Sequence, residues 1–114
     1  MAMALAFSDP DATAQREEMT RRALAALEST DIGGALEVAE EAKKVGKEAL
    51  VPVLEALATA LAVMGREAAS TGAPARTVES SARRYALALS ALRELDANAS
   101  VQLAVESMLL RMRA

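Results

Sequence analysis

The sequence predicts an all-α fold, and three observations lead to that prediction. Of the 114 residues, 53% are hydrophobic but only 2% are aromatic, so a core must be filled by Ala, Leu, Val and Met. Ala and Leu are strong helix formers. Apolar residues recur every three or four positions, whereas no alternating run is long enough for a strand. A chain of this length makes one domain with a single core. We therefore expect an up-and-down bundle of about five helices.

The first two expected helices are delimited by residues that favour helix ends. Pro10 suits the first turn of a helix over residues 10–28, because its missing N–H costs nothing there. Asp31 is expected to cap a second helix over residues 32–45. Gly46 then ends that helix, since glycine readily adopts the conformation that follows a helix.

The third expected helix, over residues 47–70, is the most apolar and should be the central one. Pro52 lies near its start, where we expect that no intrahelical N–H is needed. Residues 71–75 form the clearest loop. Across these three helices the residues expected to face inward share a spacing of three or four: Ala12, Met19, Ala23, Ala26, Leu27, Ile32, Ala35, Leu36, Ala39, Ala42, Leu50, Val51, Val53, Leu54, Leu57, Leu61 and Met64.

The last third of the chain predicts two helices joined by a short polar turn. The fourth covers residues 77–95, and the fifth covers residues 101–113 after Ser100, whose hydroxyl can accept a free N–H. The expected inward stripe of the fourth helix is Val78, Ala82, Tyr85, Leu89 and Leu92, and that of the fifth is Val101, Ala104, Val105, Met108, Leu109 and Met112.

Each of these last two helices also carries a second apolar stripe. Leu103 and Leu110 lie nearly opposite the inward face of the fifth helix, and Leu87 and Ala91 lie about opposite the main stripe of the fourth. Burial on both sides within one bundle would explain this pattern, and so would packing against a neighbouring subunit. The four residues are therefore candidate subunit-interface residues.

Charge and residue types argue against several classes of function. The net charge is −3 and basic residues occur in pairs at most, so we expect no direct binding of nucleic acid. Histidine and cysteine are both absent, which removes imidazole bases, thiolates and zinc sites. The acidic pairs Glu17-Glu18 and Glu40-Glu41 are interpreted as solvated helix faces. We expect no catalytic residue, no cofactor, no metal and no small-molecule ligand.

The hydropathy pattern bears on localisation. The strongest apolar stretch, residues 49–64, is interrupted by polar residues and Pro52, so we expect no membrane span. The apolar start of the chain is too short for a secretory signal. These patterns favour a cytoplasmic protein.

Three segments together resemble a known protein family. Residues 98–112 read Asn-Ala-Ser-Val-Gln-Leu-Ala-Val-Glu-Ser-Met-Leu-Leu-Arg-Met. This series is similar to the end of the C-terminal collar domain of the delta-prime subunit of the bacterial DNA polymerase III clamp loader, where an Asn-Ala-Asn-Pro turn precedes a Leu-rich helix. Ser100 and Val101 depart from the family's Asn-Pro. Residues 30–41 are similar to the collar's second helix, and residues 4–11 to the join between an AAA+ lid and its collar.

The resemblance implies a non-catalytic oligomerisation domain. Residues 1–114 would be a single collar-like domain at the end of a longer AAA+ subunit, with residues 1–8 as the lid-to-collar join or an added tail. Its partners would be the other clamp-loader subunits, which it would hold in a ring for loading the sliding clamp during DNA replication. The collar of the gamma/tau subunit and a free-standing helical adaptor remain alternatives. A small bundle enzyme would need an inward polar cluster, which the pattern does not indicate.

Overall fold

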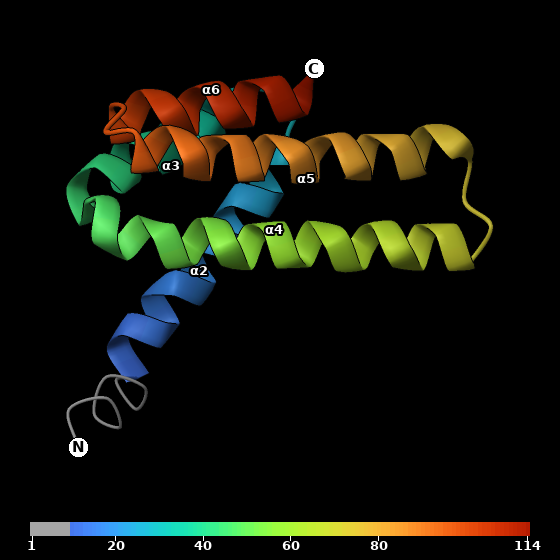
Figure 1. Cartoon of the computed structure of the whole chain (residues 1–114), viewed down its shortest axis with the longest axis horizontal. Helices are drawn as coiled ribbons and strands as arrows, with labels where there is room; N and C mark the ends of the chain where they lie inside the picture. The colour runs from blue at the N-terminus through green and yellow to red at the C-terminus, as the bar shows by residue number, and fades with distance from the viewer. Residues whose placement is uncertain (1–9) are drawn as a thin grey trace.

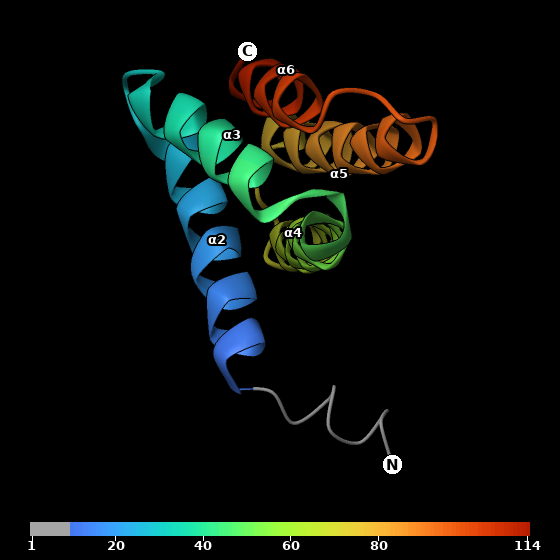
Figure 2. The same ribbon diagram turned by 90° about the vertical axis from the view of Figure 1, so that its left-hand side faces the viewer.

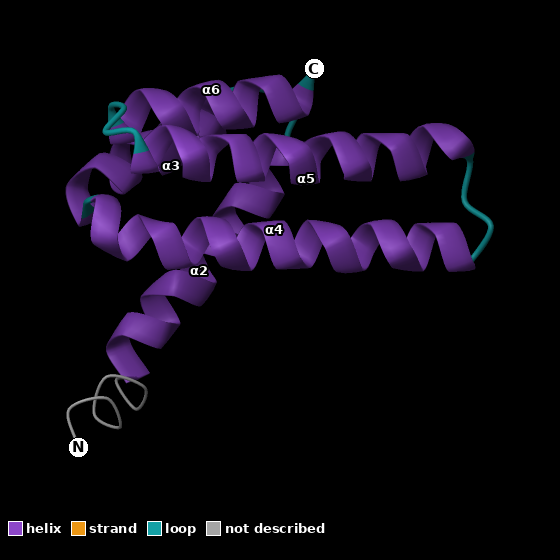
Figure 3. Ribbon diagram, viewed as in Figure 1, coloured by secondary structure: helices purple, strands orange, loops and turns teal. Residues whose placement is uncertain are grey.

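The computed structural model describes residues 10–114, and all regular secondary structure within that range is helical (Figures 1 and 3). The predicted all-α class is confirmed for these residues, and the helix bounds lie within two residues of the predicted ones. Residues 1–8, interpreted as a join or a tail, lie outside the described residues. The helices are α2 (Pro10–Glu28), α3 (Gly33–Val45), α4 (Lys47–Ser70), α5 (Ala75–Asp96) and α6 (Val101–Arg113).

The helices are arranged around one long antiparallel hairpin. Helices α4 and α5 lie side by side along the long axis of the molecule, which measures 46 Å, and α6 folds back along α5 (Figure 1). Helix α2 crosses α4 obliquely, and α3 packs between α2 and α6 (Figure 2). The last three helices therefore alternate in direction as an up-and-down bundle does, whereas α2 runs across them.

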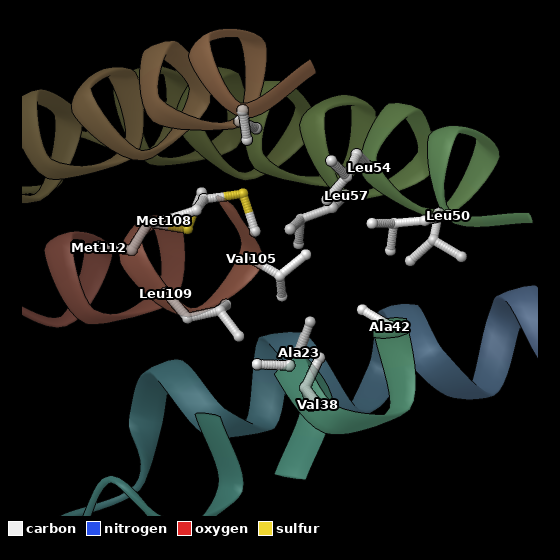
Figure 4. Packing of buried hydrophobic residues seen from close by; sticks show 14 of the residues in the cluster. Ala23, Val38, Ala42, Leu50, Leu54, Leu57, Val105, Met108, Leu109 and Met112 are labelled. Carbon is white, nitrogen blue, oxygen red and sulfur yellow. The ribbon is translucent and has the colours of Figure 1, made fainter. Parts of the chain in front are cut away.

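The core lies where α2 and α3 meet the other three helices. Every buried residue of the described chain is apolar. Helix α3 contributes Ala35, Ala39 and Ala42, which are all 0% exposed and share one face. Their short side chains allow α3 to lie close to its neighbours. The largest fully buried side chains fill the space around them (Figure 4), namely Leu50, Leu54, Leu57, Leu61, Leu95, Val105, Leu109 and Met112.

The predicted helix ends are supported by local hydrogen bonds. The Asp31 carboxylate accepts a 2.8 Å hydrogen bond from the N–H of Gly33. Gly46 ends α3 with φ = +87°, a conformation that side chains disfavour. The Ser100 hydroxyl accepts from the N–H of Leu103 at 3.4 Å, so Ser100 is the N-cap of α6 as predicted.

Some predicted inward residues face solvent instead. Ile32 is 49% exposed and Met64 is 42% exposed, and Ala12 is also exposed. On α5, Tyr85 is 37% exposed, while Ala88 takes the inward position. These predictions were wrong because a spacing pattern identifies a stripe but does not fix how far along the helix other elements cover it.

Pro52 also lies in a different position from the one predicted. It is the sixth residue of α4, and the helical bonding has already begun at Leu50, whose N–H donates to Gly46. A residue other than proline at position 52 would donate to the carbonyl of Glu48. Pro52 therefore removes one intrahelical hydrogen bond, and the expectation that no N–H was needed there is wrong.

The far part of the α4–α5 hairpin extends beyond the core. The last buried residue of α4 is Leu61 and the first of α5 is Ala88, so residues 62–87 contain none. We call residues 62–87 the hairpin arm. Within the arm the two helices are close, because a Cβ added at Gly65 would lie 3.3 Å from the Cβ of Ser81. Residues 62–82 of the arm are therefore held mainly by contacts between its two helices, whereas Arg83 and Arg84 also contact α6.

Helix α4 is the most apolar element, and its composition bears on the membrane prediction. Among the described helices, α4 alone is long and apolar enough to cross a membrane by length and composition, with a mean hydropathy of 1.6 over an 18-residue window. The core helix of a soluble protein passes the same test. One face of α4, which carries Leu50, Leu54 and Leu57, fills the core. The apolar composition of α4 is therefore explained in part by this packing.

Candidate interaction surface on the last helix

The structure separates the four candidate interface residues into different environments. Leu103 is 65% exposed, the highest value among the large hydrophobic side chains described. Leu110 and Leu87 are half-buried and pack against the core. Ala91 is 1% exposed. Of the four residues, Leu103 thus offers the most apolar surface to another molecule, and Leu110 and Leu87 each keep an accessible part.

Ala91 requires a correction. Helical spacing puts Arg84, Leu87 and Ala91 on one face of α5. That face lies against α6, because Arg84 Nε donates a 3.1 Å hydrogen bond to the carbonyl of Met112. Ala91 is thus enclosed by its own chain, and its prediction as a residue available to a partner is wrong. For α5, burial on both sides within one bundle explains the second stripe.

The second stripe of α6 has a different environment. Of the residues predicted to face inward on α6, Val101 is only half-buried, and the others are buried: Ala104, Val105, Met108, Leu109 and Met112. Leu103 and Leu110 lie about 180° around the helix from the centre of that face. They line a shallow depression on the outer surface together with Glu106, Ser107, Arg111 and Ala114. We call these six residues the α6 outer face.

The α6 outer face has a defined chemical character. Its apolar centre is Leu103 with the accessible part of Leu110. Glu106 and Arg111 provide one negative and one positive charge beside that centre. Apolar anchors surrounded by polar groups are typical of surfaces that dock another protein.

The acidic pairs noted in the sequence are at the surface. Arg21 Nε donates a 3.0 Å hydrogen bond to Glu18 Oε2, and the two side chains also form an ion pair. The hydrogen bond from Arg21 lowers the pKa of the Glu18 carboxyl below its usual value. Both side chains are more than half exposed, so the pair contributes little to stability. The interpretation of Glu18 as part of a solvated face therefore agrees with its contacts.

Two other hollows of the described structure are lined mainly by apolar residues, whereas a third, between α4 and α5, is lined by Lys47, Glu55, Arg93 and Asp96 as well as Val51 and Leu92. The most enclosed one lies between α2 and α4, with a volume of about 130 Å³, and its polar side chains are Gln15 and Arg16. A second, open groove follows the hairpin arm beside Gly65 and Tyr85, and Arg66 is its one charged lining residue. Neither of these two mainly apolar hollows is lined by an acidic residue. Among the described residues, no cluster of three or more Asp, Glu, His or Cys residues could hold a metal ion.

Sequence reasoning missed a set of arginine contacts at the end of α6. Arg83 Nη2 donates to the carbonyl of Arg111 at 2.7 Å. Arg113 Nη1 donates to the carbonyls of Ala26 and Ser29, both at 2.7 Å. With Arg84, these side chains join α5, α6 and the end of α2. The partners are 28 to 87 positions apart, so no local spacing could have indicated them.

Comparison of the chain with protein-family models, with curated proteins and with solved structures finds no match. The assignment of a function therefore depends on the geometry described above and on the sequence resemblance.

Proposed function

We propose that this domain is a non-catalytic oligomerisation module that packs against a neighbouring subunit through the α6 outer face. One observation carries the proposal: Leu103 is 65% exposed on a helix whose opposite face is fully buried. Exposure of a leucine side chain to water is unfavourable, and burying that side chain on association is favourable. The position of Leu110 in the same depression extends the apolar surface.

The resemblance supports a specific kind of neighbour. Residues 98–112, which carry the similarity to delta-prime collar domains, coincide with α6 and the turn before it. The proposed partners are accordingly the other subunits of a bacterial DNA polymerase III clamp loader, in the cytoplasm. In that assembly the domain would hold AAA+ subunits in a ring while other subunits use ATP. It would itself bind neither nucleic acid nor a small-molecule ligand.

The size of the surface limits what α6 can do alone. Stable protein interfaces bury about 800 Å² on each partner, which is more than six residues of one helix provide. Leu103 would therefore be an anchor near the centre of a larger contact. Burying a leucine side chain fully contributes about 1.5–3 kcal/mol, and 65% of Leu103 is exposed, so its loss should weaken association about fivefold or more.

The test compares two charge-introducing substitutions at exposed apolar residues. Leu103→Glu would place a carboxylate in the proposed contact, where it would be desolvated without a partner. Ile32→Glu is the matched control, because Ile32 is 49% exposed and lies at the start of α3. Native mass spectrometry of each variant mixed with purified clamp-loader subunits measures association, and circular dichroism measures helicity.

We expect Leu103→Glu to remain helical and to lose association, whereas Ile32→Glu keeps both. Association of Leu103→Glu at the wild-type level would refute the proposal. Binding only to an isolated amphipathic helix, with no binding to the subunits, would favour the free-standing adaptor. Competition distinguishes a delta-prime origin from a gamma/tau origin. The domain should compete with full-length delta-prime for the other subunits in the first case, and with full-length gamma/tau in the second.

A further inference from the structure

The end of α6 needs support from the rest of the fold. Helix α6 has 13 residues, and helices of this length are marginal in isolation. The carbonyls of its last turn have few intrahelical donors available to them. Leu110 of the α6 outer face belongs to this last turn. Contacts that fix the last turn therefore also fix part of the proposed docking surface.

Two arginines of α5 supply donors to these carbonyls. Arg83 Nη2 donates to Arg111 O at 2.7 Å, and Arg84 Nε donates to Met112 O at 3.1 Å. The side chain of Arg84 is only 19% exposed and also pairs with Glu28 Oε1 at 3.4 Å. A positive charge near the carboxyl end of a helix is favourable, because the helix dipole is negative there. The α5 arginines therefore hold the end of α6 from one side.

Arg113 holds the end of α6 from the other side. Its Nη1 atom donates two 2.7 Å hydrogen bonds, to Ala26 O and to Ser29 O. Ala26 lies in the last turn of α2, and Ser29 follows that helix directly. A single guanidinium thus joins the last turn of α6 to the end of α2. Hydrogen bonds to a charged donor are stronger than neutral ones.

We infer that Arg84 and Arg113 are positioning residues for the α6 outer face. Together they fix the last turn of α6 relative to α2, and so they fix the place of Leu110. The inference rests on the proposed function, in which this face docks a neighbouring subunit. Arg84 and Arg113 lie outside the α6 outer face, and their proposed role is to hold that face in one geometry.

The first measurement needs no partner. Amide hydrogen exchange is followed in Arg113→Met, which keeps the apolar stem but loses the donors. Arg111→Met is the matched control, because Arg111 is exposed in the same turn and its side chain makes none of these contacts. We expect exchange about tenfold faster or more in two segments together, residues 109–114 and residues 26–32. Amides near Leu57 should keep their wild-type protection, and Arg113→Lys should restore part of what is lost.

Three results would overturn the positioning role at this stage. Equal acceleration throughout the chain would show that Arg113 merely stabilises the whole fold. Equally faster exchange in Arg111→Met would show that the loss of a positive charge causes the change, and not the loss of the Arg113 hydrogen bonds. Unchanged exchange in Arg113→Met would show that the contacts do not hold the helix end.

The second measurement links the arginines to docking. Association of Arg113→Met with the purified clamp-loader subunits should be several-fold weaker. Arg66→Met on the hairpin arm also removes one positive charge and should associate normally. If Leu103→Glu abolishes association and Arg113→Met leaves it unchanged, the positioning inference fails while the proposed function stands. If Leu103→Glu itself has no effect, the proposed function fails, and the arginines lose their docking role with it.

Discussion

Leu109 and Leu103 offer a direct test of the orientation of α6, because they are the same residue type on one helix in opposite environments. Leu109 is 0% exposed and Leu103 is 65% exposed. Figure 4 shows the Leu109 side chain directed toward Ala23 of α2 and Val38 of α3. Truncating Leu109 to alanine would therefore leave a cavity beside small side chains that cannot extend into it.

The structure sets the expected magnitudes. Leu-to-Ala changes in cores cost about 2–5 kcal/mol, more where the surroundings cannot collapse. Because Leu109 is 0% exposed, we expect Leu109→Ala to lower the free energy of unfolding by about 3–4 kcal/mol, near the middle of that range. For a domain near 100 residues each kcal/mol shifts the melting temperature by roughly 4 °C, so Tm should fall by roughly 12–16 °C. Leu103→Ala should change stability by less than about 0.5 kcal/mol.

Thermal melts followed by circular dichroism, together with urea unfolding, measure both variants on the isolated chain. The urea m-value should be unchanged, since the exposed area on unfolding is nearly the same. Similar melting temperatures for Leu109→Ala and Leu103→Ala would refute the assigned faces of α6. A larger loss for Leu103→Ala would mean that α6 is rotated by about half a turn, which would also remove the basis of the proposed docking surface.

Two further predictions concern single positions. Gly46→Ala should destabilise the fold by about 1 kcal/mol, because φ is +87° there and alanine disfavours that conformation; urea unfolding measures the loss, and a gain in stability would contradict it. The pKa of Glu18 is lowered by Arg21, so any stability from this pair is present above the usual glutamate pKa and is lost as pH falls through the lowered one. An NMR titration should show the pKa of Glu18 rising toward its usual value in Arg21→Gln, and an unchanged pKa in that variant would exclude Arg21 as the cause.

Local signals accounted for the parts of the fold that could be predicted. Pro10, Gly46 and Ser100 each act on the turn in which they lie, so their effects can be derived from a few neighbouring residues. The inward face of α6 was also predictable, because α6 is the last helix and its most apolar stripe is the one that the other helices cover. Its apolar positions, such as Val105 and Met108, follow directly from helical spacing.

The faces of α5 could not be predicted in the same way. This helix lies between α4 and α6, so both of its apolar stripes are used within the molecule. Spacing alone cannot distinguish a stripe that contacts a second helix of the same chain from one that contacts a partner. Ala91 was misassigned for this reason. The contacts of Arg84 and Arg113 could not be predicted from the sequence, because they depend on how α5, α6 and the end of α2 meet in the fold.

The hairpin arm has a mechanical consequence. From Leu61 to the end of α4 at Ser70 the helix extends roughly 14 Å, at 1.5 Å per residue. Beyond Arg83 and Arg84, which contact α6, the arm is braced by the pairing of its two helices, so a change in their angle at the edge of the core would move that part as a lever. A tilt of roughly 10° about that edge would carry the tip through roughly 2 Å by the same helical rise. A distance probe attached at Thr71, at the tip of the arm, would thus detect a change in helix angle. The same change would move side chains in the core by much less than it moves the tip.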